Sequence, residues 1–295
     1  MNAVVLREVG GDLALEEWDE PAGTVVDVRA AGVNFADVLL RRGLYPQMPE
    51  LPYVLGSEVA GELDGRRVVA WTRGGGGYAE RAAVDPGWVF DLPGSASFAA
   101  GAAFLTTYLT AWLPLSARAG AGSVLVHAGS GGVGTAAIQL AKALGWTVVA
   151  TASTPEKQAF ALRAGADEVR GYDAIDDLRV DLVVDPVGGE IFTRSLQLLK
   201  PLGTIAAIGF AGGMWQDPSV QWLVGRNVSV SGVYLGRLMQ HEPDRVRGMV
   251  EDVLALWRTG SIDPVVGATF PLADAAGAHA LIESRRHMGK VVLEP

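Results

Sequence analysis

A glycine-rich turn joins an apolar run to an alanine-rich run near the middle of the chain. Residues 123–128 read Ser-Val-Leu-Val-His-Ala, as in a buried strand, and residues 135–144 have the composition of a helix. Between them, Gly129, Gly131 and Gly134 match the pattern G-x-G-x-x-G. In a strand–turn–helix unit, such glycines let backbone amides approach a pyrophosphate at the N-terminus of the helix. The turn therefore predicts a dinucleotide site in an α/β sheet, with a glycine-rich turn of a domain that binds no nucleotide as the alternative.

Strands and helices alternate on the C-terminal side of this turn, whereas both ends of the chain have a different pattern. Short, nearly continuous apolar strands separated by helices indicate a parallel sheet covered on both faces. About the first 90 residues instead show short β-rich runs between Gly, Pro and Asp. We therefore predict an α/β fold, a Rossmann-type doubly wound parallel sheet inserted in a mainly β domain. Its expected helices cover 97–113, 134–144, 155–164, 190–199, 244–259 and 272–286, and its expected later strands cover 147–151, 180–185, 204–210, 227–234 and 290–293.

Composition excludes several classes of function. The chain has 295 residues, a net charge of −9 and no cysteine, so disulfides and cysteine-ligated metals are excluded. No basic run exceeds two residues, which argues against a nucleic-acid partner. The N-terminus has no basic region followed by a long apolar stretch, and the uncharged residues 92–117 contain Pro93 and Pro114. We expect a cytoplasmic protein with no membrane span and no nucleic-acid partner.

The strand after the glycine-rich turn favours NADPH over NADH. An NAD site usually ends this strand with Asp or Glu, which binds the ribose 2′-hydroxyl. Here residues 151–154 read Thr-Ala-Ser-Thr, and Lys157 follows in the first turn of the expected helix. A cation does not stabilise a helix at its N-terminus, but it would pair with a 2′-phosphate. The alternatives are that Lys157 is solvated or pairs with Glu156, and an S-adenosylmethionine site would also want the missing acidic residue.

Several motifs resemble those of a known family. They are Ala31-Gly-Val-Asn-Phe-Ala-Asp37, Gly56-Ser-Glu-Val-Ala-Gly61, Val184-Asp-Pro-Val-Gly-Gly189 and the ending Gly289-Lys-Val-Val-Leu293, together with the glycine-rich turn. With these residues the chain is similar, nearly end to end, to the medium-chain dehydrogenase/reductase superfamily, in its zinc-free NADPH:quinone oxidoreductase (ζ-crystallin-like) branch. The resemblance implies a GroES-like catalytic domain in residues 1–106 and 236–295, and a Rossmann domain in residues 107–235.

The resemblance also implies a cofactor site. The pyrophosphate would be contacted by Gly131, Gly132 and Val133 of the glycine-rich turn. The 2′-phosphate would be surrounded by Ser153, Lys157, Tyr172 and, from the C-terminal segment, Arg285. The nicotinamide would lie near Thr110 and Asn34, with Ile208 and Phe210 lining that end.

Structural roles remain open for some of these residues and their neighbours. Tyr172 could be a surface turn residue, Arg285 could pair with Glu283, and Asn34 could hold a loop through its amide. Asp37 and Arg41 could form a helical ion pair, because they lie four residues apart. His127, at the end of the expected buried strand, is better explained as a core histidine with satisfied hydrogen bonds than as a catalyst.

Zinc chemistry is not expected. Zinc alcohol dehydrogenases of the superfamily have Cys where this chain has Asn34 and His where it has Ser57, and only Glu58 is kept. An amide and a hydroxyl do not form a zinc site. Without metal, Asn34 is our candidate donor to a carbonyl oxygen, and Tyr45 is a weak candidate proton donor beside it. Leu39 stands where some relatives place a tyrosine beside the substrate.

The expected function is transfer of a hydride from NADPH to a quinone or another α,β-unsaturated carbonyl compound. The alternatives are an enoyl-thioester reductase and, in another class, a non-catalytic NADPH-binding sensor or structural crystallin-like protein. We also expect a homodimer, because the apolar run 227–234 would lie at the edge of the sheet, where a second copy could pair.

Overall fold

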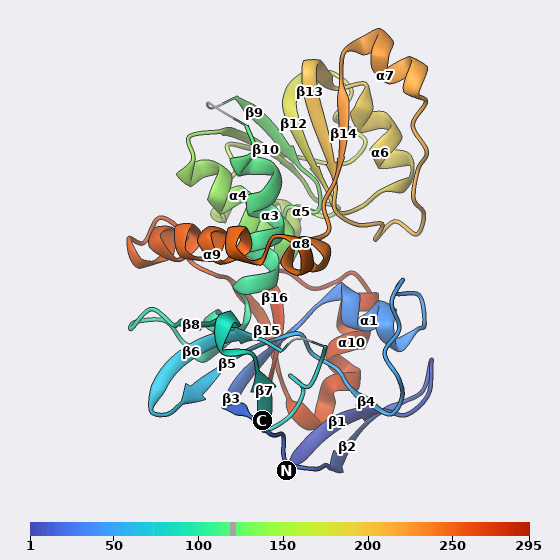
Figure 1. The fold of residues 1–295 in the computed structure, drawn as a ribbon. Helices are drawn as coiled ribbons and strands as arrows, with labels where there is room; N and C mark the ends of the chain where they lie inside the picture. The colour runs from blue at the N-terminus through green and yellow to red at the C-terminus, as the bar shows by residue number, and fades with distance from the viewer. Residues whose placement is uncertain (73, 119–121) are drawn as a thin grey trace. The chain divides into compact units, whose positions relative to one another are not determined.

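The computed structural model of the protein describes residues 1–72, 74–118 and 122–295. The chain divides into two compact units, the first formed by residues 1–106 and 264–295 and the second by residues 107–263 (Figure 1). Each unit has its own cluster of buried apolar side chains. The second unit interrupts the first in the sequence, as an inserted sheet requires.

The first unit consists mainly of antiparallel strands in two sheets. A three-stranded sheet has the order β2 (Leu13–Glu17), β1 (Asn2–Leu6), β4 (Tyr53–Val54). A seven-stranded sheet has the order β15 (Val266–Pro271), β16 (Lys290–Glu294), β3 (Thr24–Val33), β5 (Glu58–Leu63), β6 (Arg66–Trp71), β8 (Val89–Asp91), with β7 (Arg81–Val84) also paired to β3. In the seven-stranded sheet, β15 and β16 are parallel and the other pairs are antiparallel. Helices of this unit are α1 (Phe35–Arg41), α2 (Phe98–Ala102) and α10 (Ala275–Glu283), with short 3₁₀ turns at Pro86–Trp88 and Leu272–Asp274.

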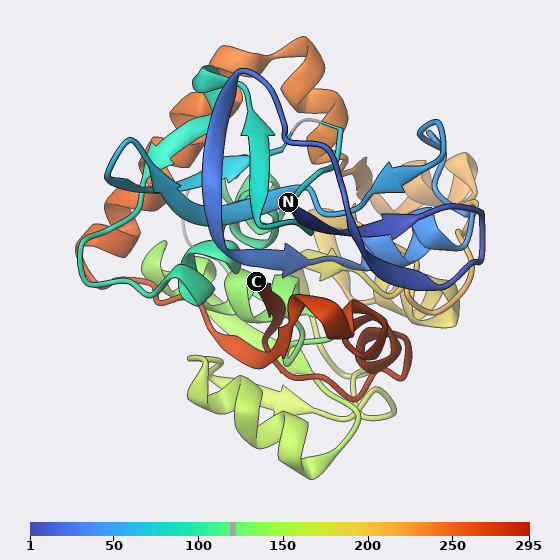
Figure 2. The same cartoon turned by 90° about the horizontal axis from the view of Figure 1, so that it is seen from below.

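Both ends of the chain belong to the first unit. The N-terminus and the C-terminus lie near one another in two perpendicular views (Figures 1 and 2). Strand β16 pairs with the long strand β3 in antiparallel register, with Val291 opposite Val33 and Val292 opposite Gly32. The last residues of the chain are therefore part of the same sheet as residues 24–33.

The helix expected over residues 97–113 is broken into two. Ser97 begins α2, since its Oγ accepts the backbone N–H of Ala100 at 3.0 Å. A second helix, α3 (Leu105–Ser116), then starts in the first unit and continues into the second. The carboxylate of Glu58 accepts the backbone N–H of Thr106 at 2.8 Å, so a side chain distant in sequence satisfies the first turn of α3.

The second unit contains a six-stranded, entirely parallel sheet, which confirms the predicted fold class. Its order is β11 (Glu168–Arg170), β10 (Thr147–Thr151), β9 (Ser123–Val126), β12 (Val180–Asp185), β13 (Leu199–Ala207), β14 (Ser229–Gly232). The chain starts at β9, runs outward to β11 and then returns to β12. The switch point between β9 and β12 is where ligands of doubly wound sheets bind. The helices of this unit are α4 (Gly132–Ala143), α5 (Pro155–Arg163), α6 (Gly189–Leu196), α7 (Val220–Arg226), α8 (Leu235–His241) and α9 (Pro243–Arg258).

Several expected boundaries differ from the structure. The strand expected over 204–210 is Leu199–Ala207, the helix expected over 190–199 is Gly189–Leu196, and the helix expected over 272–286 is Ala275–Glu283. The last strand of the sheet begins two residues after Asn227, because Asn227 ends α7 in the left-handed conformation (φ 52°). Residues 236–263, expected in the catalytic domain, belong to the second compact unit. At the end of this segment, Gln139 of α4 donates to the carbonyl oxygen of Asp263 at 2.8 Å and accepts its N–H at 2.9 Å.

Within the described residues, no helix has the length and apolar character needed to cross a membrane. The uncharged residues near 92–117 belong to β8, α2 and α3 instead.

Candidate functional site

The glycine-rich turn is held tightly against the end of β9. Gly131 is the N-cap of α4, and no side chain caps the helix there. At Gly134, a Cβ would lie 2.1 Å from the carbonyl oxygen of Ala128, so only glycine allows this approach of helix to strand. The first amides of α4, at Gly132 and Val133, have no acceptor within the helix, and both residues are half-buried. The turn thus presents N–H groups and the positive end of a twelve-residue helix at an accessible edge.

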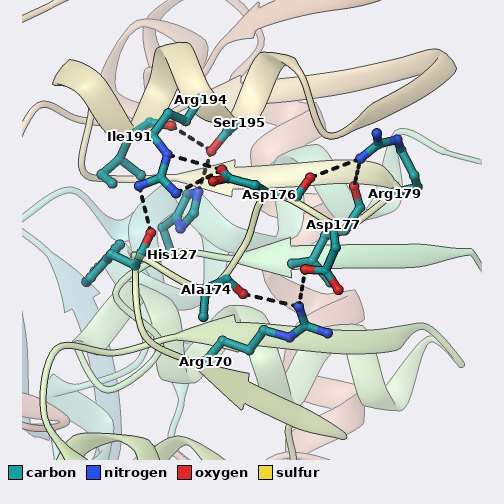
Figure 3. Close-up of polar contacts among 11 residues, drawn as sticks. His127, Arg170, Ala174, Asp176, Asp177, Arg179, Ile191, Arg194 and Ser195 are labelled. Atoms are coloured by element: carbon teal, nitrogen blue, oxygen red, sulfur yellow. Dashed lines mark hydrogen bonds and ion pairs between the residues drawn. The ribbon is translucent and has the colours of Figure 1, made fainter.

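His127, which follows β9, has a structural role. Its Nδ1 lies 2.8 Å from Oγ1 of Thr151. Its Nε2 lies 2.7 Å from Oγ of Ser195 (Figure 3). Because the Ser195 hydroxyl donates to the carbonyl oxygen of Ile191 at 2.7 Å, its oxygen accepts a hydrogen bond from Nε2–H of His127. Burial, with a smaller effect of the nearby Arg194 charge, lowers the pKa of His127 to about 3. The prediction of a core histidine with both nitrogens satisfied is confirmed.

Residues predicted around a 2′-phosphate follow β10 and β11, the two strands on one side of β9. Ser153 and Lys157 come after β10, and Tyr172 comes after β11, so the carboxyl ends of adjacent parallel strands carry all three. Thr154 caps α5, with Oγ1 accepting the backbone N–H of Lys157 at 3.3 Å. Partial burial lowers the pKa of Lys157, and the nearby Glu156 opposes this effect.

Tyr172 contacts the glycine-rich turn directly. Its hydroxyl accepts the backbone N–H of Ala128 at 3.1 Å, and its ring stacks on His127 with centroids 5.9 Å apart. Arg194 holds the tyrosine from the other side, because its Nη1 donates to the carbonyl oxygen of Tyr172 at 2.9 Å while Nη2 pairs with Asp176 at 2.8 Å (Figure 3). Tyr172 is therefore a fixed part of this edge of the sheet rather than only a surface turn residue.

Ile208 and Phe210 lie in a segment that is bound to the end of β12. The N–H of Ile208 donates to the carbonyl oxygen of Asp185 at 2.9 Å, and the N–H of Ala211 donates to that of Pro186 at 3.1 Å. The Phe210 ring contacts Trp215, with centroids 4.8 Å apart. The segment therefore extends the same carboxyl edge of the sheet beyond β12. Thr110, the remaining candidate of this unit, lies in α3 with 9% of its surface exposed.

Asn34, Tyr45 and Arg285 belong to the first unit. Tyr45 is half-buried in the irregular segment after α1. Arg285 follows α10 in the left-handed conformation (φ 56°), and the carboxylate of Glu283, its alternative partner, pairs with Arg42 at 2.7 Å. The structure thus brings most cofactor candidates to one edge of the second unit, whereas these three residues lie in the other unit.

Asn34 lies at the centre of a buried ion pair that sequence reasoning missed. The Lys290 ammonium donates to Oδ1 of Asn34 and to Oε1 of Glu58, at 2.6 Å each. Nδ2 of Asn34 donates to the same Oε1 at 2.9 Å. Lys290 and Glu58 are 3% and 1% exposed, respectively. A lysine inside the otherwise apolar strand 290–293, in a chain with few lysines, was the available signal.

A second layer of buried polar groups supports the backbone of Asn34. Oδ2 of Asp37 accepts the N–H of Asn34 at 2.7 Å and the Tyr78 hydroxyl at 3.0 Å. Tyr78 OH in turn lies 3.3 Å from Nε2 of His279. Burial raises the pKa of Asp37 to about 6 and lowers that of His279 to about 4. The alternative ion pair of Asp37 with Arg41 is not formed, because Arg41 donates to the carbonyl oxygen of Gly11 instead.

Among residues 1–72, 74–118 and 122–295, no cluster of three or more His, Asp or Glu side chains could hold a metal ion. Asn34 stands where zinc alcohol dehydrogenases of the superfamily have a cysteine. Here Asn34 and Glu58 are both bound to the Lys290 ammonium. A second cation beside Glu58 would be repelled by that charge.

Comparisons with known proteins agree with this architecture. Residues 20–94 match the alcohol dehydrogenase GroES-like domain, and residues 144–293 match the zinc-binding dehydrogenase family. A mouse (Mus musculus) quinone oxidoreductase is 32% identical over 327 residues, covering 99% of this chain and 97% of the relative.

Two solved structures are also similar over their full lengths. The quinone oxidoreductase from Thermus thermophilus, studied also in its complex with NADPH, has a TM-score of 0.90 at 36% identity, with 100% of both chains covered. A mycobacterial protein complexed with NADPH has a TM-score of 0.92 at 31% identity, again with 100% of both chains covered.

Proposed function

Because this chain belongs to the zinc-free quinone oxidoreductase branch of the medium-chain dehydrogenase/reductase superfamily, we propose that it reduces a quinone or another α,β-unsaturated carbonyl compound with NADPH. The observation that carries the proposal is the tight turn at residues 128–134. It aims the backbone amides of α4 outward at the switch point of a doubly wound sheet.

The residues at the end of β10 support NADPH as the cofactor. No carboxylate stands at residues 151–154, where one would bind the 2′-hydroxyl of NADH and repel a phosphate. Lys157 lies in the first turn of α5, where its charge is not needed for helix stability. The Tyr172 hydroxyl, bound to the glycine-rich turn, adds a polar group on the neighbouring strand end. These residues fit a 2′-phosphate, and two NADPH-bound relatives have the same fold.

When bound, NADPH supplies the hydride, and the protein has to orient the acceptor and stabilise the negative charge that forms on its oxygen. Asn34 is the proposed donor, because its half-buried amide is held in one orientation by two charged neighbours. Quinones and enones are electron-poor, so positioning and a neutral donor can suffice. Solvent can supply the proton, and Tyr45 remains a weak candidate for its delivery.

Zinc independence is part of the proposal. The chain has no cysteine, and the Glu58 carboxylate forms a buried ion pair with the Lys290 ammonium. We expect full activity after dialysis against a strong chelator. Stoichiometric zinc in the purified protein, lost together with activity, would contradict this.

The deciding experiment is NADPH oxidation with a panel of acceptors: a small quinone, a larger quinone, an enone and an enoyl thioester, each repeated with NADH. We expect turnover of a quinone or enone with preference for NADPH. Preference for the thioester would identify an enoyl-thioester reductase. Tight NADPH binding without turnover of any acceptor would indicate a sensor or structural protein.

We also propose that the protein forms a homodimer through β14. This strand is at the edge of the six-stranded sheet, and among the strands that the structure describes it pairs with β13 only. Three apolar side chains near it, Leu202, Val220 and Val224, are 76%, 73% and 71% exposed. A second copy would cover this apolar edge.

A further inference from the structure

Lys290 and Glu58 converge on Asn34 because of the register of three strands. In the β3–β16 pair, Val33 lies opposite Val291, so the next residues along, Asn34 and Lys290, face one another. Glu58 begins β5 on the other side of β3, and Gly32 leaves room for its carboxylate. A Cβ on Gly32 would lie 2.6 Å from Oε1 of Glu58. The fold itself therefore places one cation and one anion on the two sides of this amide.

The two charges dictate which way the Asn34 amide points. Its oxygen accepts from the Lys290 ammonium, and its nitrogen donates to the Glu58 carboxylate. The flipped amide would set NH₂ against the ammonium and oxygen against the carboxylate, which is repulsive on both sides. Thr106 donates its N–H to the other oxygen of Glu58 at 2.8 Å, so the carboxylate is fixed as well.

Hydrogen-bond accounting identifies what this arrangement offers to a ligand. Within the described part of the chain, Nδ2 of Asn34 donates one hydrogen to Glu58, and its second hydrogen can bind a ligand at this half-buried side chain. A cation on Oδ1 polarises the amide and strengthens that N–H as a donor, most of all in an interior of low dielectric constant. The Glu58 carboxylate balances the charge of the Lys290 ammonium, so the pair adds no net charge beside the donor.

We propose that Lys290 is a positioning residue: held by Glu58, it fixes and polarises the Asn34 amide so that one N–H is directed at the acceptor oxygen. This inference rests on the proposed function and adds to it two residues that do not touch the substrate. Lys290 and Glu58 act through Asn34, and their effect should vanish when Asn34 cannot donate.

The test is a double-mutant cycle that measures whether the contribution of Asn34 to kcat depends on the Lys290–Glu58 ion pair. Asn34→Ala is made in the wild type and in a Lys290→Met/Glu58→Gln background, which removes both charges and nearly preserves shape. In the wild type we expect Asn34→Ala to lower kcat for the quinone roughly 100- to 1000-fold, as loss of a donor to a developing oxyanion does. In the uncharged background the same change should cost less than about threefold. An equal loss in both backgrounds would overturn the inference.

Lys200→Met is the matched control, because Lys200 forms a different ion pair, with Asp181 at 2.9 Å in the second unit. In this background the effect of Asn34→Ala should stay as large as in the wild type. The Kd for NADPH should not change in the Lys290→Met/Glu58→Gln background or in Lys200→Met. A purely structural role of Lys290 would instead lower NADPH binding and turnover together.

A second measurement does not depend on turnover. Hydrogen exchange of the Asn34 side-chain amide, followed by NMR, should be slow in the wild type and at least about tenfold faster without the ion pair. Equal exchange would overturn the inference even in an active enzyme, whereas absence of quinone turnover with the expected exchange would defeat only the proposed function. Should the uncharged variant not fold, Lys290→Arg carries the test. With the charge retained, the amide should stay protected and Asn34→Ala should keep its full effect, and loss of either would overturn the inference.

Discussion

The Asp37 carboxylate accepts a hydrogen bond from Tyr78 at 3.0 Å inside the first unit, and the same oxygen accepts the backbone N–H of Asn34 at 2.7 Å. The position of the candidate donor thus depends on a carboxyl group that is 2% exposed. Burial raises the pKa of Asp37 to about 6, and the hydrogen bonds and the Lys290 charge offset only part of this effect.

The raised pKa of Asp37 predicts a pH dependence of stability with a defined sign. The native state holds a proton on Asp37 that the unfolded chain releases, so this group's contribution to stability falls as the pH rises from about 4 to about 6. The size is up to about 3 kcal/mol. Replacing Asp37 by Asn should remove this contribution, which urea unfolding of both proteins at several pH values measures. The wild-type minus Asp37→Asn difference isolates it from His127 and His279, whose lowered pKa values give the opposite slope. A difference that does not vary with pH would contradict the assignment.

Lys157→Ala should lower NADPH affinity by about 1.5–3 kcal/mol, the range for a hydrogen bond to a charged group. NADH affinity should hardly change, because NADH has no 2′-phosphate. Titration of both nucleotides by fluorescence or calorimetry gives the two Kd values. Lys142→Ala is the matched control, since Lys142 pairs with Asp167 at 2.7 Å in the same unit. Equal losses for NADPH and NADH would remove Lys157 from the phosphate site.

Gly134→Ala should disrupt the glycine-rich turn. The new Cβ would lie 2.1 Å from the carbonyl oxygen of Ala128, a backbone atom that cannot move without displacing the turn. We expect a loss of about 1–3 kcal/mol of stability, together with a loss of NADPH binding. Gly248→Ala in α9 is the control, because its Cβ would meet no atom within 4 Å. That change should stabilise the helix by about 0.5–1 kcal/mol and leave binding intact. Normal NADPH binding by Gly134→Ala would show that the turn does not hold the cofactor.

The parallel sheet and its glycine-rich turn could be predicted because both are encoded locally. Apolar strands of four to six residues and a turn in which Gly134 is sterically required leave their pattern in consecutive residues. Two of the differences from the expected boundaries involve contacts between residues far apart in the sequence. Glu58 caps the first turn of α3, and Gln139 ties residue 263 to the second unit.

The Asn34 cluster could be predicted only in part. Asn34 and Glu58 stood out because they occupy positions compared with a zinc site. Lys290 did not, because its role arises from the pairing of β16 with β3, more than 250 residues apart in sequence. Buried ion pairs are formed by register between strands, and a single sequence carries no local sign of that register.

We expect the homodimer to form at the exposed edge of β14, and a single charged substitution at this edge should dissociate it. Val224 on α7 is 71% exposed beside the start of β14, where it borders a shallow hollow with Leu202 and Val228. Val224→Glu would place a charge in the apolar interface, so we expect the dimer Kd to rise at least about tenfold. Leu162→Glu on α5 is the matched control. It is also exposed, at 49%, but its helix packs against β11 at the opposite edge of the sheet. Analytical ultracentrifugation at micromolar concentration should find dimers for the wild type and Leu162→Glu, and monomers for Val224→Glu. A monomeric wild type would refute the dimer itself, whereas three dimers would move the interface away from β14.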